Sequence, residues 1–349
     1  MNLLFKNSTD FWVPSYLLND TSYIKIANIP LLTMFLISIL ITIYVVLHGI
    51  KVINGIRKLH SNATWIILSI LAAWFEGLLG FLLVFPYKFG VWTVGEPSQE
   101  VYFGLESKDY LSLDLSWKCV PLLLGSILIW HYLGMLNGGI LCFVFERTVA
   151  TLLARDYESH PRRWLSISLH ISHHLIACFM CLFFCFHMLP LKILLFFNAL
   201  GFVVLVPYIF FLRFYNRRVR NQMRLAENIT SHSLAAKFQV EENMRSMNIA
   251  ARIAMVVGIF DVLFLIIIVL ATCQVPNAER FFQTTEFLLV VNPLFLIPGV
   301  MTSVAEWKTK FMAILPINRL RIDPNFNPYV LPVRENSNLH FSQLESYWI

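Results

Sequence analysis

The chain has 349 residues, of which 57% are apolar and only 14% are charged, and its mean hydropathy is +0.65. A soluble domain carries about a quarter charged residues, so this composition excludes an ordinary soluble protein. The formal net charge of +6 would suggest a nucleic-acid partner for a soluble chain. In a chain this apolar, the basic excess instead indicates membrane topology and contact with anionic lipid of the bilayer, so no nucleic-acid partner is expected.

Seven apolar blocks divide the chain, and each is long enough to cross about 30 Å of hydrocarbon as a helix. The blocks lack the alternating pattern of barrel strands, and lipid cannot satisfy an open backbone, so helices are expected. The predicted fold is therefore an all-α membrane protein, a bundle of seven transmembrane helices. In chain order the predicted spans are Pro30–Ile50, Thr64–Pro86, Cys119–Phe145, Trp164–Leu189, Leu191–Leu212, Ile253–Gln274 and Gln283–Val304.

The basic residues between the blocks predict the orientation. Twenty of the 27 Lys and Arg residues lie in the first, third and fifth loops and the C-terminal tail, and seven lie in the remaining connections. Because cytoplasmic loops are enriched in basic residues, we predict an extracellular N-terminal tail over 1–29, a seven-helix domain over 30–304 and a cytoplasmic tail over 305–349. Sequons at Asn7 and Asn19 predict glycosylation of the extracellular tail.

Three cysteines, Cys119, Cys185 and Cys273, lie towards the predicted extracellular ends of spans. A disulfide between two of them is compatible with the oxidising side of the membrane, but spacing does not choose the pair. On the third span, Gly134 and Gly138 present a small-residue face that predicts close helix packing.

Three segments beyond the apolar blocks have helical spacing. Five arginines between Arg213 and Arg224 predict that the fifth span continues as a helix below the membrane. Apolar residues recur at three or four positions over Phe238–Ile249, which predicts an amphipathic helix leading into the sixth span. Glu306–Met312 combines aromatic and basic residues and predicts a short helix along the inner membrane surface.

Few ionisable residues lie inside the predicted spans, where each is costly. Glu76, His131 and Glu286 could line a water-filled cavity open to the outside and contact a small-molecule ligand. The alternative is that they pair with each other or with backbone groups and fix the helix packing.

Two local motifs predict a switch. Glu146-Arg147 stands at the cytoplasmic end of the third span, where the acid can hold the arginine at rest and a freed guanidinium can donate to a partner's carbonyls. The alternative is that Arg147 only anchors the helix at the membrane surface. Asn292-Pro293 interrupts the hydrogen-bond ladder of the seventh span and predicts a kink.

One motif suggests metal chemistry. His170-Ile-Ser-His173-His174 fits the H-x-x-H-H box of membrane di-iron oxygenases, but that chemistry needs several such boxes and the chain has no second one. No phosphate-binding loop, nucleophile elbow or paired-cysteine metal spacing is present either. We therefore expect no enzyme, no metal and no cofactor.

The seven spans, Glu146-Arg147 and Asn292-Pro293 together resemble a G-protein-coupled receptor. The agreement with the rhodopsin-like pattern is partial, because Thr148 replaces the usual aromatic residue and Leu296 stands where a tyrosine would complete the seventh-span motif. A narrower resemblance accounts for these departures. Phe145–Glu158, followed by Pro161-Arg162-Arg163, resembles the nematode serpentine chemoreceptors of the Sra superfamily, and Phe238–Asn243 resembles its epsilon class, Sre.

This resemblance implies a receptor of the plasma membrane, in the cilia of sensory neurons, that detects an environmental chemical or pheromone. It also implies signalling through a heterotrimeric G protein, and homo- or hetero-oligomers are compatible with it. The resemblance does not identify the ligand.

Two other functions are compatible with seven spans. A ligand-gated channel subunit, similar to insect odorant receptors, would place the N-terminus inside, against the charge distribution. A small-solute transporter would favour internal repeats with broken helices in matched positions, and the sequence shows none. The sequence therefore favours the chemosensory receptor.

Overall fold

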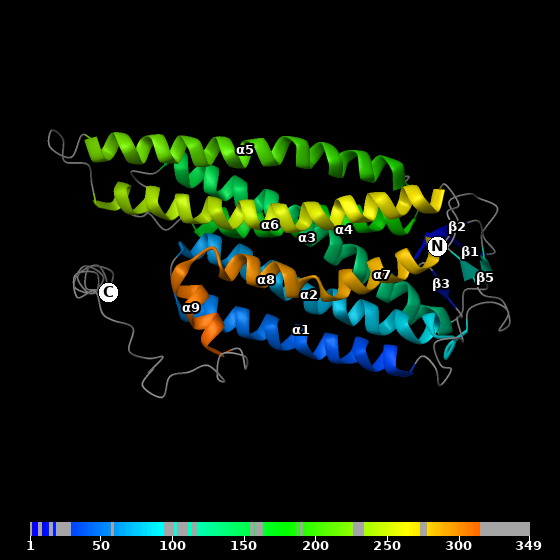
Figure 1. Cartoon of the computed structure of the whole chain (residues 1–349). Helices are drawn as coiled ribbons and strands as arrows, with labels where there is room; N and C mark the ends of the chain where they lie inside the picture. Colours follow the sequence, from blue (N-terminus) through cyan, green and yellow to red (C-terminus); the bar gives the residue numbers. More distant parts are fainter. Residues whose placement is uncertain are drawn as a thin grey trace, which may run out of the picture.

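The computed structural model describes residues 2–5, 9–13, 17–18, 29–56, 59–93, 101–102, 111–113, 117–153, 157, 163–186, 188, 191–225, 234–272 and 278–314. Its long helices lie side by side along one direction (Figure 1). Seven helices in this part of the chain are long and apolar enough to cross a membrane, which confirms the predicted bundle.

The helices are α1 (Ile29–Gly55), α2 (Ser61–Lys88), α3 (Val120–Leu152), α4 (Arg163–Cys185), α5 (Leu191–Leu225), α6 (Leu234–Thr272), α7 (Ala278–Val291), α8 (Pro293–Met301) and α9 (Ala305–Ile314). A single 3₁₀ turn over Trp117–Cys119 leads into α3. The seventh span is assembled from α7 and α8, which a break at Asn292 separates.

Five short strands, which the sequence analysis did not predict, lie at the end of the bundle beside the N-terminus (Figure 1). They are β1 (Asn2–Phe5), β2 (Thr9–Trp12), β3 (Leu17–Leu18), β4 (Val101–Tyr102) and β5 (Leu111–Leu113). In one sheet β1 pairs antiparallel with β2 and parallel with β5, and in the other β3 pairs antiparallel with β4. Strands from the N-terminal tail and the second loop thus cover this end together.

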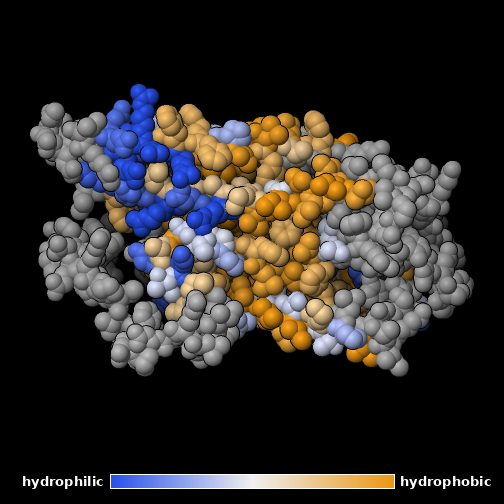
Figure 2. Space-filling view, viewed as in Figure 1, coloured by the Kyte–Doolittle hydropathy of each residue, from blue (hydrophilic) through white to orange (hydrophobic). Residues whose placement is uncertain are grey.

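Two helices continue well beyond the spans predicted for them. The fifth span was expected to extend as a helix, and α5 does run to Leu225. The sixth begins at Leu234, far before the predicted Ile253, as one uninterrupted helix that includes the expected amphipathic segment. Figure 2 shows hydrophilic residues gathered at the end where α5 and α6 project, and a hydrophobic zone across the middle of the molecule.

Helix α3 is the centre of the bundle, since it packs against α2, α4, α5 and α6. Its closest approach is to α2, where glycines face each other. A Cβ on Gly80 would lie 2.8 Å from the backbone oxygen of Gly125, and a Cβ on Gly125 would lie 2.8 Å from that of Gly80. Because backbone atoms cannot move aside as a side chain can, only glycine fits at this crossing.

The predicted small-residue face of α3 is confirmed against α4. Gly134 faces Ala177, whose Cβ would lie 3.2 Å from a Cβ added to the glycine. One turn further along α3, Gly138 accommodates the imidazole of His173. These positions let α4 lie close to α3.

The expected helix after the seventh span is also confirmed, as α9. It packs against α1: Trp307 is buried and its indole Nε1 donates to the carbonyl of Ile56 at 3.1 Å. Phe311 is buried against the imidazole of His48, with ring centroids 5.4 Å apart.

The glycine crossing of α2 and α3 gives a stability prediction. Gly80→Leu should destabilise the protein by about 1–3 kcal/mol, because the new side chain forces the two backbones apart. The measurement is the thermal unfolding midpoint of detergent-solubilised protein. Gly201→Leu is the matched control, because a Cβ at Gly201 meets nothing within 4 Å. Equal midpoints for the two variants would contradict the packing described above.

Candidate functional site

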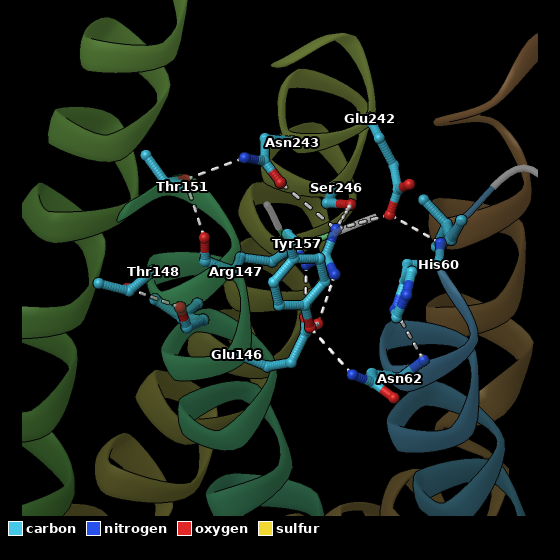
Figure 3. Close-up of polar contacts among 12 residues, drawn as sticks. His60, Asn62, Glu146, Arg147, Thr148, Thr151, Tyr157, Glu242, Asn243 and Ser246 are labelled. Carbon is cyan, nitrogen blue, oxygen red and sulfur yellow. Dashed lines mark hydrogen bonds and ion pairs between the residues drawn. The ribbon is translucent and has the colours of Figure 1, made fainter. Parts of the chain in front are cut away.

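Glu146 and Arg147, near the last turns of α3, are both completely buried, with side-chain exposures of 0%. The guanidinium donates through Nε to the Glu146 carboxylate, so the pair is in contact as the sequence suggested. Burial of this kind is inconsistent with Arg147 acting only as a surface anchor. The arginine instead reaches sideways, towards α6 (Figure 3).

The partner of Arg147 on α6 is a second acid. Arg147 Nη1 donates to Glu242 Oε1 at 2.7 Å and also approaches Asn243 Oδ1 at 3.4 Å and Ser246 Oγ at 3.5 Å. The same Glu242 oxygen accepts from the backbone N–H of His60, just before α2, at 2.7 Å. One carboxylate thus joins α2, α3 and α6.

Tyr157, which follows α3, closes the other side of the pair. Its hydroxyl donates to Glu146 Oε1 at 2.5 Å and accepts from Asn62 Nδ2 at 3.0 Å. Burial raises the pKa of the Tyr157 phenol, and the adjacent Glu146 carboxylate raises it further. The phenol therefore keeps its proton and serves as a permanent donor to Glu146.

His60 contributes in its neutral form. Burial, which outweighs the neighbouring carboxylate of Glu242, lowers the pKa of His60. The neutral imidazole uses Nδ1 to accept from the backbone N–H of Asn62 at 3.3 Å, which caps the start of α2.

A row of neutral polar side chains extends the site towards α5. Thr151 Oγ1 accepts from Asn243 and from Asn216 of α5, each at 3.1 Å. Gln239 Nε2 donates to Asn243 Oδ1 at 3.0 Å. We call the whole group the arginine cluster; it consists of His60, Asn62, Glu146, Arg147, Thr151, Tyr157, Asn216, Gln239, Glu242, Asn243 and Ser246.

The arginine cluster contains two carboxylates for one guanidinium. In addition to Arg147, the hydroxyl of Tyr157 donates to Glu146 and the backbone N–H of His60 donates to Glu242. Removing one member of a buried ion pair costs about 3–5 kcal/mol, because the remaining charge is left buried with neither a partner nor water around it. The cluster can therefore hold α2, α3 and α6 in one arrangement. Partly separated arrangements of these helices are unfavourable, because each would leave a buried charge unpaired.

The second predicted motif, Asn292-Pro293, lies at the break between α7 and α8. Asn292 is buried, and its side-chain amide donates to the hydroxyl of Tyr132 on α3 at 2.6 Å. The carbonyl of Val290, in the last turn of α7 where backbone acceptors lack helical partners, accepts from Trp74 Nε1 of α2 at 2.8 Å. The break is therefore fixed to α2 and α3 by side chains.

The three predicted ligand-contacting residues do not meet in one place. His131 Nδ1 lies 2.6 Å from Glu76 Oε1, within the bundle. Glu286 pairs instead with Lys88 in the last turn of α2. Glu76 and Lys88 are separated by about 18 Å along α2, at about 1.5 Å per residue. The structure thus shows two polar pairs at different depths.

A small pocket adjoins the second pair. It lies between α1, α2, α3 and α7, and among the described residues that line it Lys88 and Glu286 are the charged ones. The other lining residues are apolar, namely Phe35, Phe81, Val84, Phe85, Ile129, Phe287 and Val290. Such a lining suits a small apolar molecule with one polar group.

Some predictions fall outside the described residues, namely glycosylation at Asn7 and Asn19 and any disulfide that uses Cys273. Four members of these sites were not predicted from the sequence: Trp74, Tyr132, Tyr157 and Glu242. A signal existed for Glu242: Gln239, Glu242, Asn243 and Ser246 recur at helical spacing and form a polar stripe on one face of α6.

A seven-helix bundle with a buried arginine joining its third and sixth spans, and a proline break in its seventh, defines a seven-transmembrane receptor. Residues 1–349 match the family described as Sre G protein-coupled chemoreceptor, and the chain belongs to this family. Its relatives include serpentine receptor class epsilon-31 of Caenorhabditis elegans, 27% identical over 99% of this chain and 100% of the relative. Serpentine receptor class epsilon-38 of the same organism is 24% identical over 98% of this chain and 99% of the relative.

The membership confirms the resemblance inferred from Phe145–Glu158 and Phe238–Asn243. The protein is a multi-pass membrane protein and a chemosensory receptor, and its family is not a family of enzymes.

Proposed function

We propose that the arginine cluster is the switch through which this receptor controls a heterotrimeric G protein. The observation that carries the proposal is the fully buried pair between Arg147 on α3 and Glu242 on α6. In the resting arrangement the guanidinium is saturated by two carboxylates and cannot serve a partner protein. When α6 moves away from α3, Arg147 loses Glu242 and its freed donors face the opening.

The projecting ends of α5 and α6 would border that opening. Arg213, Arg217 and Arg218 on α5 are exposed, and Arg220 contacts Glu241 of α6 at 3.4 Å. This basic surface suits a partner segment that presents acidic side chains or the carbonyl end of a helix. The G-protein subtype does not follow from it.

The ligand, in this proposal, enters the pocket beside Lys88 and Glu286 from the extracellular side. Glu286 and Val290 both line the pocket and lie one turn apart on α7. Val290 is also the residue whose carbonyl is held by Trp74, two residues before the break at Asn292. A ligand that shifts α7 would therefore act directly on the contacts of the break to α2 and α3.

This mechanism requires the N-terminus to be extracellular and the arginine cluster cytoplasmic, as the basic residues predict. We place the receptor in the plasma membrane, at the cilia of sensory neurons, with glycans at Asn7 and Asn19. Glu76 and His131 then lie deeper than the ligand and serve the packing of α2 on α3.

Glu242→Gln tests the switch. The substitution keeps the shape of the side chain but removes its charge, so it weakens the hold on Arg147 by about 1.5 kcal/mol. Basal nucleotide exchange on the coupled G protein should rise by up to about tenfold. Glu241→Gln is the matched control. Glu241 is adjacent to Glu242 in the sequence, but it is partly exposed and its contact with Arg220 is long, at 3.4 Å.

Arg147→Lys should abolish coupling while the protein still reaches the cell surface, because lysine keeps a positive charge between Glu146 and Glu242 but lacks the planar donors of the guanidinium. Unchanged basal exchange in Glu242→Gln, together with normal coupling in Arg147→Lys, would remove the switch role from this cluster.

Phe287→Ala tests the ligand pocket. Any agonist found by screening the wild-type receptor should need at least about tenfold higher concentration on this variant, since removal of an aromatic wall is worth about 1.4 kcal/mol or more. Phe179→Ala provides the control, because this substitution removes the same number of atoms at a position on α4 that is exposed and away from the pocket. An equal loss for both variants would place the ligand elsewhere.

The orientation is tested with an epitope at the N-terminus. Intact cells should stain, and endoglycosidase should shift the protein on a gel unless Asn7→Gln and Asn19→Gln are both present. Staining only after permeabilisation of cells with well-trafficked protein would reverse the orientation and favour a channel-like subunit.

A further inference from the structure

Four ionisable side chains form a continuous chain inside the bundle, between α2, α3 and α4. Glu76 Oε1 lies 2.6 Å from His131 Nδ1, and the imidazole of His131 stacks on that of His174 with centroids 5.4 Å apart and planes 22° apart. His174 Nε2 lies 3.2 Å from His170 Nε2, so one ring donates and the other accepts. We call these four residues the histidine cluster.

Neither the arginine cluster nor the ligand pocket includes these residues, although ionisable groups within a membrane-spanning region are costly and usually functional. The cluster is not sealed within the protein, because the Glu76 side chain is 29% exposed and His170 and His174 are half-buried. The other titratable groups that act on it are on α4. They are His173, which turns towards Gly138 of α3, and Cys178 and Cys181.

We propose that the histidine cluster is a proton-binding site, through which acid changes the packing of α4 on α3 and thereby the response of the receptor. This site is separate from the proposed ligand pocket and from the G-protein switch. Its ligand is the proton, which histidine binds in the range between pH 5 and 8.

The geometry explains why a proton would matter here. Glu76 and His131 lie 2.6 Å apart, so a carboxylate and an imidazolium at these positions would balance each other. A further proton on the His170–His174 pair, shared across the 3.2 Å contact, brings a second positive charge against the stacked ring of His131. The two like charges then repel each other across the interface of α3 and α4.

The packing of α4 on α3 beside the cluster is close, so the two helices cannot adjust slightly to relieve this repulsion. Gly134 and Ala177 are in close contact, and His173 fills the space above Gly138. Since packed interfaces rearrange in discrete steps, charging the cluster should loosen α4 from α3 as a unit.

The test is the thermal unfolding midpoint of the full chain in lipid nanodiscs at pH 7.5 and pH 5.5. The wild-type midpoint should fall by about 3 °C or more at the lower pH. In His174→Gln and His170→Gln most of this fall should disappear. His340→Gln is the control, because His340 belongs to the predicted cytoplasmic tail, and it should retain the wild-type fall.

This measurement needs no G protein and no ligand, so it stands apart from the proposed switch. If His174→Gln does not fold, His170→Gln and Glu76→Gln report on the same contacts. In cells, basal signalling should change between external pH 7.5 and 6.0 in the wild type and not in His170→Gln. An unchanged wild-type midpoint, or the same fall in His170→Gln as in His340→Gln, would overturn the proposal.

Discussion

A fully buried guanidinium needs acidic partners beside it to balance its charge. The positions of several helices in this structure depend on which residues provide those partners for Arg147. Glu146 is adjacent in sequence, but it accounts for only part of the donors of Arg147. The remainder is supplied by Glu242, which requires α6 to continue as a helix far below its apolar segment. Glu242 in turn takes its second donor from His60, which sets where α2 begins. Because an unpaired buried charge is so costly, these helix ends stay together in the arrangement described here.

The polar contacts at the two ends of the bundle differ in strength, because they differ in how far they are removed from water. In the arginine cluster the charges are completely desolvated, so each contact is strong and the arrangement changes only as a whole. Lys88 and Glu286, at the far end of α2, keep side-chain exposures of 10% and 16%. Water screens such a pair in part, so it is weaker and easier for a small molecule to displace. The proposed function calls for both properties: a site where a ligand can displace a contact, and a distant cluster that resists thermal opening.

The centre of the bundle connects these two ends. Gly80 and Gly125 bring α2 and α3 into backbone contact, and the ring of Tyr132 lies over Gly77. Tyr132 also binds Asn292, while Trp74 holds the last turn of α7. In the proposed mechanism, a shift in α7 would be transmitted to α2 and α3 through these contacts, which are too tight to deform gradually. Arg147 lies on the same α3 helix as Tyr132, about four turns further along.

The sequence by itself determined the seven-helix architecture, because apolar length and the demand for backbone hydrogen bonds in lipid leave few alternatives. It also singled out Glu146, Arg147, Asn292 and Pro293, since charges and prolines at helix ends and within spans are conspicuous. It predicted the helix that leads into the sixth span but placed the start of that span too late, because hydropathy does not register a polar face that is buried against other helices. Which residues pair was decided only by the tertiary structure: Arg147 with Glu242, Tyr132 with Asn292 and Lys88 with Glu286 come from helices distant in the chain. Such partners depend on how each helix is rotated and how deep it sits, and packing between neighbouring side chains fixes both.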